Sequence, residues 1–429
     1  MRTLKLTSET KKELLGNLLN RNPGSYTEYE NTVNDIISNI RTNRDKALFD
    51  YTYKFDKCRL SSDSVRITEE EIKEAYSALS PEFIEVMKKS AANIRSFHEK
   101  QKRNTWIETR ENGSILGQRI LPIEISGVYV PGGKAAYPSS VLMNVIPAKV
   151  AGVERIVMCT PPGKDGKVNP GTLVAADIAG VTESYKVGGA QAIAAMAFGT
   201  ESIPKVDKIT GPGNIFVALA KKACFGHVSI DSIAGPSEIL VLADENANPR
   251  YVAADLLSQA EHDEMASAIL VTTSAELADR VTSEIDGFLK TLSRADIIRK
   301  SLDNYGYIFV ADNMDDAIDA ANAVASEHLE IITANPFEVM TKIKNAGAIF
   351  LGDYSSEPLG DYYAGPNHIL PTNRTARFFS PLSVDDFVKK TSIISYSKQA
   401  LYDVHTDIEL FAGEEGLTAH ANSIAVRFE

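Results

Sequence analysis

The chain has 429 residues, 44% of them hydrophobic and 24% charged, and is therefore long enough to fold into more than one domain. Its formal net charge of −12 argues against nucleic acid or an anionic membrane as the main partner. No apolar run approaches the roughly 20 residues that span a bilayer, and the N-terminus lacks the apolar stretch of a signal peptide. Three widely spaced cysteines, Cys58, Cys159 and Cys224, are expected to be free thiols in a reducing cytoplasm.

Residues 1–112 are predicted to form a helical region that packs on the second of two later lobes and on a dimer partner. A leucine stripe between Thr10 and Leu19 has helical spacing, and Thr68–Glu71 is a capping-box sequence that marks a further helix. Ser80-Pro81 is expected to open a long helix that ends near Lys102. His98 lies late in that helix among charged residues, and we expect it on the surface.

The pattern changes near residue 113, where short β-branched runs begin to alternate with Ala-rich helical runs separated by glycine. This alternation predicts an α/β fold with two Rossmann-like, doubly wound parallel-sheet lobes. We place the first lobe at 113–238, the second at 239–372 and a small C-terminal tail domain at 373–429. Pro147 is expected to end or kink a helix that begins near Ser139.

Three glycine-rich turns follow predicted strands of the first lobe, at Val130–Gly133, Val187–Gln191 and Thr210–Asn214. Ligands of an open parallel sheet bind beyond the carboxyl ends of its strands, where glycine lets backbone N–H groups approach an anion. None of the three turns has the G-x-G-x-x-G pattern of dinucleotide-binding proteins. Taken singly, each turn indicates a plain tight connection, and the three together make a phosphate- or nucleotide-sized ligand an equal alternative.

A predicted helix of the second lobe begins at Asn248-Pro249, a capping residue followed by a proline. At about 100° per residue, Asp255, Gln259 and His262 fall together on a flank beside its apolar stripe. Such a helix is either a surface helix with a polar rim or one wall of a site. Gln is a poor zinc ligand compared with His, Cys, Asp and Glu, so the helix alone does not decide between these alternatives.

An ordered series of short motifs joins these features, and it resembles the histidinol dehydrogenase family. The series covers about two thirds of the chain, and residues before it carry no motif of that family. Its members are Gly127–Gly133, Tyr137–Ser140, Val187–Ala192, Gly211–Asn214, Ala234–Glu238, Leu257–His262, Ser326–Leu329, Gly360–Tyr362, Gly365–His368 and Glu415–His420.

The resemblance implies oxidation of L-histidinol to L-histidine through the aldehyde, with two NAD⁺ reduced in succession and one zinc ion per subunit. It implies zinc ligands at Gln259, His262, Asp361 and His420. Nitrogen and oxygen donors suit zinc, and one anionic ligand among four leaves the metal most of its positive charge. The zinc then serves chiefly to position the substrate.

The same resemblance assigns the chemistry to Glu327 and His328. Alcohol oxidation needs a base for the hydroxyl proton, which suits His328, and aldehyde oxidation needs an activated water, which suits Glu327. Adjacent residues on a strand point to opposite faces, so we expect the pair in a turn or at the end of an element.

Further contacts follow from the resemblance. NAD⁺ is expected to bind in the first lobe, and the zinc and catalytic residues lie in the second. The implied NAD⁺ contacts are Tyr129, Gln191 and Asn214. The implied substrate contacts are Ser237, Gln259, His262, His328, Asp361, His368, Glu415 and His420. The family forms homodimers in the cytoplasm, with the C-terminal region serving the opposite subunit's site.

Two other classes of protein remain as alternatives. A zinc hydrolase would use Glu327 or Glu261 with a metal-bound water and no dinucleotide, and the three glycine turns speak against it. A non-catalytic binding module on two doubly wound lobes would leave Glu327 and His328 without a chemical role.

Overall fold

The computed structural model describes residues 1–19, 21, 27–132, 137–233 and 235–429. Gly133 and Ala234, two members of the motif series, lie outside these ranges. The chain divides into two compact units. The larger unit combines Met1–Gln101 with Glu124–Phe387, and the smaller unit combines Lys102–Ile123 with Val388–Glu429.

The first lobe of the larger unit is a five-stranded parallel sheet with the order β6-β5-β4-β7-β8. Counted along the chain, this is the order 3-2-1-4-5 of a doubly wound sheet, and its topological switch point lies between β4 and β7. The strands are β4 (Ile125–Tyr129), β5 (Arg155–Cys159), β6 (Glu183–Tyr185), β7 (Lys208–Thr210) and β8 (Ser229–Ile230).

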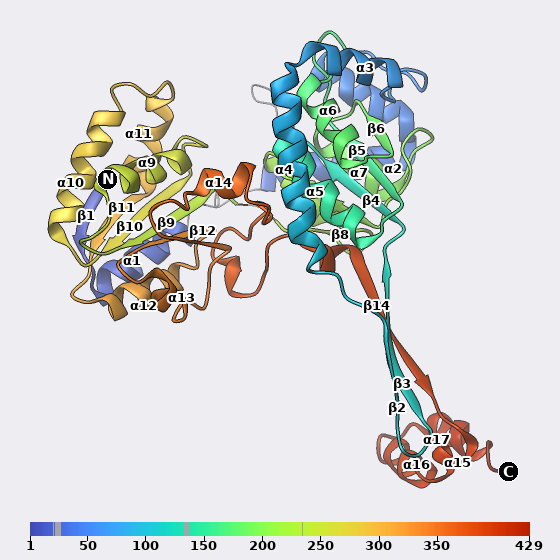
Figure 1. Cartoon of the computed structure of the whole chain (residues 1–429). Helices are drawn as coiled ribbons and strands as arrows, with labels where there is room; N and C mark the ends of the chain where they lie inside the picture. Colours follow the sequence, from blue (N-terminus) through green and yellow to red (C-terminus); the bar gives the residue numbers. More distant parts are fainter. Residues whose placement is uncertain (20, 22–26, 133–136, 234) are drawn as a thin grey trace. The chain divides into compact units, whose positions relative to one another are not determined.

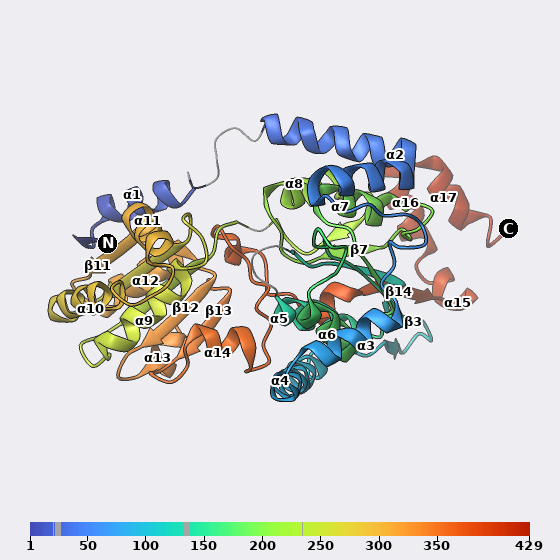
Figure 2. The same ribbon diagram turned by 90° about the horizontal axis from the view of Figure 1, so that it is seen from above.

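Helices cover both faces of this sheet (Figure 2). On one side lie α2 (Thr27–Asp56), α7 (Gly189–Phe198) and α8 (Ile215–Cys224). On the other side lie α3 (Glu69–Ala78), α4 (Pro81–Glu99), α5 (Pro138–Ala151) and α6 (Pro170–Ala179). The capping box expected at Thr68 is present, because its hydroxyl accepts from the N–H of Glu71 and the Glu71 carboxylate accepts from the N–H of Thr68.

The second lobe is a six-stranded parallel sheet with the order β1-β11-β10-β9-β12-β13. Without its first strand it repeats the 3-2-1-4-5 order, so both lobes are doubly wound as predicted. The strands are β1 (Arg2–Lys5), β9 (Glu238–Ala243), β10 (Ser267–Thr272), β11 (Gly306–Val310), β12 (His328–Ile332) and β13 (Ala348–Leu351).

The helices of the second lobe form two layers on its sheet (Figure 1). One apolar cluster packs α9 (Pro249–Ala260), α10 (Ala275–Phe288) and α11 (Ala295–Tyr305) on one face. The other cluster packs α1 (Ser8–Leu19), α12 (Met314–Val324) and α13 (Pro336–Met340) on the opposite face. The short helices α14 (Glu357–Tyr362), η1 (Thr375–Arg377) and η2 (Val384–Phe387) follow β13.

The first hundred residues are thus shared between the lobes: β1 and α1 complete the second, whereas α2, α3 and α4 cover the first. Among the described residues, no helix has the length and apolar character needed to cross a bilayer.

The smaller unit contains a three-stranded antiparallel sheet, in the order β14-β3-β2, and three helices. Its residues 102–123 were assigned from sequence to the N-terminal region and the start of the first lobe. The elements are β2 (Trp106–Thr109), β3 (Ile115–Pro122), β14 (Val388–Ser395), α15 (Lys398–Tyr402), α16 (His405–Glu414) and α17 (Thr418–Ala425).

His98 is fully buried, so the prediction that it lies on the surface was wrong. The buried face of α4 includes Met87, Ala91 and Ile94, and His98 continues that face one turn later. Its Nδ1 lies 2.8 Å from the carbonyl oxygen of Ile94 and its Nε2 lies 3.4 Å from Asn367 Nδ2. The charged neighbours in the sequence lie on other faces of the helix.

The helix α5 does not end at Pro147 but continues to Ala151. Proline has no N–H, so the carbonyl of Met143, four residues earlier, loses its helical donor. The Asn367 side-chain amide donates to that carbonyl at 2.8 Å. A residue from the loop before His368 therefore supplies the hydrogen bond that Pro147 cannot make.

This arrangement predicts a compensating pair of substitutions. Asn367→Ala should lower the free energy of unfolding by about 1–3 kcal/mol, because it leaves the buried Met143 carbonyl without a donor. Adding Pro147→Ala should recover part of that loss, because the new N–H can bond to Met143. Urea unfolding of the two single variants and the double variant measures the coupling. Simple additivity of the two effects would contradict this account.

Candidate functional site

A cleft of about 590 Å³ brings together residues from both lobes of the larger unit. The first lobe contributes the turns that follow β4 and β7, including Gly132 and Asn214. The second lobe contributes the residues that precede β9 and β12 and the end of α9. Seven of the predicted site residues line it from the second lobe: Ser237, Gln259, His262, Glu327, His328, Asp361 and His368.

Glu327 and His328 lie at the start of β12, as expected for a pair that must face one cleft from the end of an element. Both side chains are largely buried. His328 Nδ1 lies 3.0 Å from the carbonyl oxygen of Glu238, and this acceptor requires the proton to sit on Nδ1. His328 Nε2 is then the basic nitrogen, and within the described chain it has no hydrogen-bond partner.

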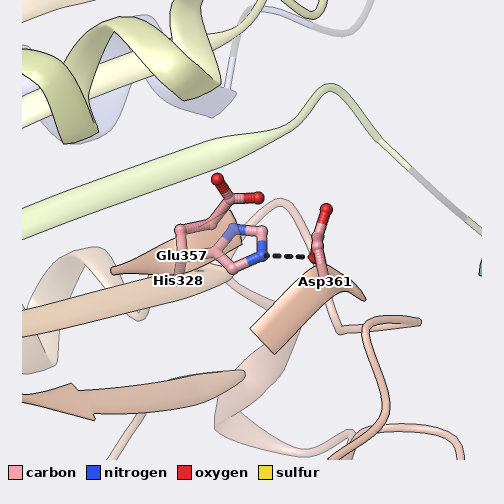
Figure 3. A group of neighbouring side chains, drawn as sticks. All are labelled: His328, Glu357 and Asp361. Atoms are coloured by element: carbon pink, nitrogen blue, oxygen red, sulfur yellow. Dashed lines mark ion pairs between the residues drawn. The ribbon is translucent and has the colours of Figure 1, made fainter. Parts of the chain in front are cut away.

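The cleft environment keeps His328 in its neutral form. Burial lowers the pKa of the His328 imidazole to about 4, and the Glu238 carbonyl only partly opposes this shift. His328 Nε2 points toward Asp361, with 4.0 Å between that nitrogen and Asp361 Oδ1 (Figure 3). A neutral imidazole with its free nitrogen in a cleft is equipped to accept a proton from a bound hydroxyl group.

Glu327 is held beside this imidazole by a single backbone donor. Its Oε2 accepts the N–H of Glu238 at 3.0 Å and lies 3.7 Å from His328 Nδ1. Burial raises the pKa of the Glu327 carboxyl well above its ordinary value, and the neighbouring carboxylates of Glu238 and Asp361 add to the shift. An ionised carboxylate with a raised pKa is a strong base for drawing a proton from water.

Two carboxylates, Glu357 and Asp361, lie close to His328. Ligand atoms of His328, Glu357 and Asp361 all lie within 4.8 Å of one another (Figure 3). Burial raises the pKa of both Glu357 and Asp361, which are hydrogen-bonded to each other. Uncompensated carboxylates this close together favour either a shared proton or a cation.

Glu357 and Asp361 are themselves fixed by further polar contacts. Ser258 Oγ donates to Glu357 Oε2 at 3.1 Å, and the N–H of Glu357 donates to Glu330 Oε1 at 2.8 Å. Glu330 in turn shares a hydrogen bond with Asp255, the carboxylate on the flank of α9. The chain of carboxylates thus runs from Asp361 back to the flank of α9.

The donors at this end of the cleft fit a zinc ion. Gln259 is almost fully buried, and within the described residues its Oε1 has no hydrogen-bond partner. A buried amide oxygen without a partner is costly unless a cation or ligand engages it. Together with the Asp361 carboxylate and the His262 imidazole, which also line the cleft, it forms the nitrogen and oxygen set that zinc accepts.

His262 does not lie on the flank of the α9 helix, where the sequence placed it, and His368 lies in a loop. The helix α9 ends at Ala260, so His262 follows in the turn, where it is exposed and its N–H donates to the carbonyl of Gln259. His368 Nδ1 lies 3.2 Å from the carbonyl oxygen of Asp361, and its Nε2 lies 3.4 Å from Ser140 Oγ of the first lobe. Burial lowers the pKa of His368 to about 4.

The first-lobe side of the cleft is formed by the turns at the switch point. Gly211 has φ +117°, and a Cβ there would lie 2.0 Å from the carbonyl oxygen of Tyr129. Its N–H donates to Asp231 Oδ2 at 2.8 Å, and Lys221 Nζ donates to its carbonyl at 3.0 Å. Lys221 and Asp231 also form a buried ion pair. Asn214 caps α8, its Oδ1 accepting from two backbone N–H groups.

Tyr129 and Gln191, the other predicted cofactor contacts, are almost fully buried and lie outside the residues that line the cleft. Tyr129 Oη accepts the N–H of Gly189 at 3.1 Å, which ties the turn after β6 to the end of β4. Tyr129 therefore stabilises the turn after β6 at the carboxyl edge of this sheet.

Comparison with known proteins shows to which family the chain is similar. A model of the histidinol dehydrogenase family matches residues 19–428. The chain is 60% identical over 398 residues to a histidinol dehydrogenase from Clostridium acetobutylicum, covering 93% of this chain and 92% of the relative. It is 58% identical over 422 residues to one from Caldanaerobacter subterraneus subsp. tengcongensis, covering 98% of both chains.

The chain belongs to the histidinol dehydrogenase family. Its fold agrees with a crystal structure of histidinol dehydrogenase from Elizabethkingia anophelis, with a TM-score of 0.94 and 40% identity. That alignment covers 100% of this chain and 98% of the other. The resemblance drawn from the motif series is therefore confirmed, as is the α/β fold class.

The remaining predicted site residues of this family member belong to the smaller unit. Glu415 follows α16 and His420 lies in α17, and both are exposed there. Their assignment to the substrate and zinc sites stays a prediction.

Sequence reasoning missed Glu357 and Glu238. Glu357 and Asp361 are four residues apart, and a helix places such a pair on one face. The signal was Ser356-Glu357-Pro358, a typical helix start, which predicts this short helix. Glu238 ends the motif Ala234–Glu238, but the motif gave no indication of its role, because Glu238 contacts both bases through its backbone.

Proposed function

We propose that the protein oxidises L-histidinol to L-histidine through the aldehyde, reduces two NAD⁺ in succession, and holds one zinc ion per subunit. The proposal rests on the family and, in this chain, chiefly on one observation. His328 is neutral, its Nδ1 is anchored to a carbonyl, and its Nε2 faces the cleft beside a second base, Glu327. A protein with a binding role alone has no need of two bases held in this way.

In the first half-reaction, His328 Nε2 accepts the hydroxyl proton as the C–H bond of the alcohol carbon breaks. NAD⁺ supplies the oxidising power of both half-reactions by accepting the hydride. In the second half-reaction, Glu327 takes a proton from a water molecule whose oxygen adds to the aldehyde carbon. A second C–H bond then breaks, and the acid is released with its protons. Thiol catalysis is not part of this scheme, because Cys159 and Cys224 are buried and burial raises the pKa of both thiols.

Zinc, when bound, would hold the substrate's amino and imidazole nitrogens and so fix the alcohol carbon near His328. Gln259, His262 and Asp361 are the candidate ligands in the larger unit, and His420 is the candidate in the smaller one. The contacts of Ser258 with Glu357 and of Glu357 with Asp361 keep one ligand oriented. Ser237 and His368 are the proposed substrate contacts in the cleft wall.

For NAD⁺ we propose the carboxyl edge of the first lobe. Its switch point lies between β4 and β7, and the glycine-rich turns after these strands line the cleft. In this proposal Tyr129, Gln191 and Asn214 contact the dinucleotide. Asn214 lines the cleft, and Tyr129 also holds the turn after β6.

We further propose a cytoplasmic homodimer in which Glu415 and His420 complete the partner's site. All three cysteines are free and buried, which suits a reducing compartment. The smaller unit exposes large apolar side chains, with Ile394, Leu410 and Phe411 each at least 66% exposed. Apolar surface of this kind is typical of an interface with another protein chain.

The proposed function leads to a direct prediction of activity. The metal-replete protein should produce NADH from L-histidinol and NAD⁺, with two NADH formed per histidine, and a chelator should abolish this activity until zinc is restored. Absorbance of NADH and the amount of histidine formed are measured together. Absence of histidinol-dependent NADH would refute the proposal, and hydrolysis of an ester or amide substrate in its place would favour a zinc hydrolase.

The second prediction separates the two bases. Glu327→Gln should slow oxidation of supplied aldehyde by about 10²–10⁴-fold while affecting the first hydride step less, because the amide cannot accept the water proton. Aldehyde oxidation by the unaltered enzyme should rise with pH through an ionisation well above the ordinary glutamate range, since Glu327 must be ionised to act. Rapid-mixing measurements of each half-reaction across pH provide the comparison.

His328→Asn is the matched control for that experiment. It should slow alcohol oxidation and leave the zinc content unchanged, because His328 is not a proposed ligand. Equal losses in both half-reactions for Glu327→Gln, or loss of metal from His328→Asn, would show that the roles are misassigned.

The third prediction concerns the shared site. Inactive His420→Ala and inactive His262→Ala proteins, mixed under conditions that exchange subunits, should recover activity. Each mixed dimer then contains one site with both histidines intact, so recovery should approach a quarter of the unaltered activity. Subunit exchange is verified by mass spectrometry of differently tagged chains, and exchange without recovery would rule out sharing.

A further inference from the structure

Glu238, the first residue of β9, makes backbone contacts with both proposed catalytic residues. Its N–H donates to Glu327 Oε2 at 3.0 Å, and its carbonyl accepts from His328 Nδ1 at 3.0 Å. A displacement of this one peptide segment would therefore change the position of the carboxylate and the tautomer and orientation of the imidazole together.

The side chain of Glu238 is anchored by Arg21, from the segment after α1. Arg21 Nη2 forms an ion pair with Glu238 Oε1, and both side chains are almost fully buried. Burial raises the pKa of the Glu238 carboxyl, while the charge and hydrogen bond of Arg21 act in the opposite direction. The Asn373 backbone also donates to this carboxylate.

Arg21 is itself fixed on several sides. Its Nη1 donates to the carbonyl of Met265 at 3.2 Å, and its Nε donates to the carbonyl of Leu18 at 3.4 Å. Its guanidinium lies over the Tyr305 ring at 5.8 Å. The planar guanidinium thereby joins the end of α1, the turn before β10 and the start of β9, which a lysine could not do at once.

We propose that the Arg21–Glu238 ion pair is a positioning device for the catalytic bases. Neither side chain lines the cleft, so neither touches substrate or cofactor. Arg21 holds the Glu238 carboxylate, and the Glu238 backbone then holds the Nδ1–H tautomer of His328 and one oxygen of Glu327. This inference rests on the proposed function, because it assumes that these two residues are the working bases.

The energetics favour a geometric role. A buried ion pair is commonly no more stabilising than apolar side chains of similar volume, because desolvation offsets the attraction between the charges. Small displacements of a catalytic group, by contrast, cost much activity. The pair thus contributes more to the placement of Glu327 and His328 than to the stability of the fold.

The closing experiment uses Arg21→Ala in the metal-replete protein. The kcat for histidinol oxidation should fall by about 10- to 100-fold while the KM for histidinol changes little, since the proposed zinc ligands lie on other elements. Added guanidinium ion should occupy the vacated space and restore much of the lost kcat, whereas sodium chloride at equal ionic strength should not.

A second readout does not depend on turnover. In protein with ¹⁵N-labelled histidine, the His328 resonance should report the Nδ1–H tautomer in the unaltered chain and a mixture of tautomers in Arg21→Ala, with guanidinium restoring the first state. If the unaltered protein fails to oxidise histidinol, the proposed function falls, and this spectrum still decides whether Arg21 positions His328.

Matched variants complete the design. Glu238→Gln should lose kcat in parallel but show no guanidinium rescue, because Arg21 still fills the space that the ion would occupy. Arg250→Ala, which removes an exposed ion pair with Glu284 in the same lobe, should change neither readout. If Arg21→Ala does not fold, Arg21→Lys retains the charge without all three contacts and should give a smaller loss of the same kind. A folded Arg21 variant with unaltered kcat and tautomer, or with lost kcat but neither rescue nor tautomer change, would overturn the inference.

Discussion

Burial of charge at the amino ends of β9 and β12 is the constraint on which the site depends. Glu238 begins β9, Glu327 precedes β12 and Glu330 lies within β12, and all three are buried. Carboxylates in such a place are unstable unless each finds a donor or a cation. Arg21 serves Glu238, one backbone N–H serves Glu327, and Asp255 shares a hydrogen bond with Glu330. The positive charge of a bound metal would relieve the remaining excess near Asp361.

The two lobes have the same strand order but present opposite edges to the cleft. The first lobe uses the carboxyl edge, where Gly132 and Gly211 line the cleft and the backbone of Gly211 packs closely against the Tyr129 carbonyl. The second lobe uses the amino edge, where Glu327 and His328 stand at the start of a strand. Glycine-rich turns suit a ligand rich in phosphate. Side chains at the beginning of a strand, in contrast, have little conformational freedom. The proposed cofactor site and the proposed bases thus lie at edges with different physical properties.

Much of the fold followed from local signals. The capping box at Thr68, the proline at the start of α4 and the alternation of strands and helices all correspond to observed elements. Two other features depend on contacts that local signals do not report, and one of them, the burial of His98, contradicts the prediction. Pro147 remains inside α5 because Asn367, more than two hundred residues later, donates to the freed carbonyl. His98 is buried because the side of α4 that faces the protein extends beyond its apolar residues.

The residues of the site likewise divide into those that the sequence predicted and those that it did not. Glu327, His328 and Asp361 could be named from sequence because their side chains form part of short motifs, and the cleft contains all three. Arg21 lies 217 positions from its partner in a region without any motif, and Glu238 contacts both bases through peptide groups that every residue possesses. Sequence patterns report side-chain chemistry, but they are silent about a backbone hydrogen bond whose value depends on what holds the strand in place. The N-terminal segment, which contributes no proposed substrate or metal contact, is for that reason part of the structure that orients the bases.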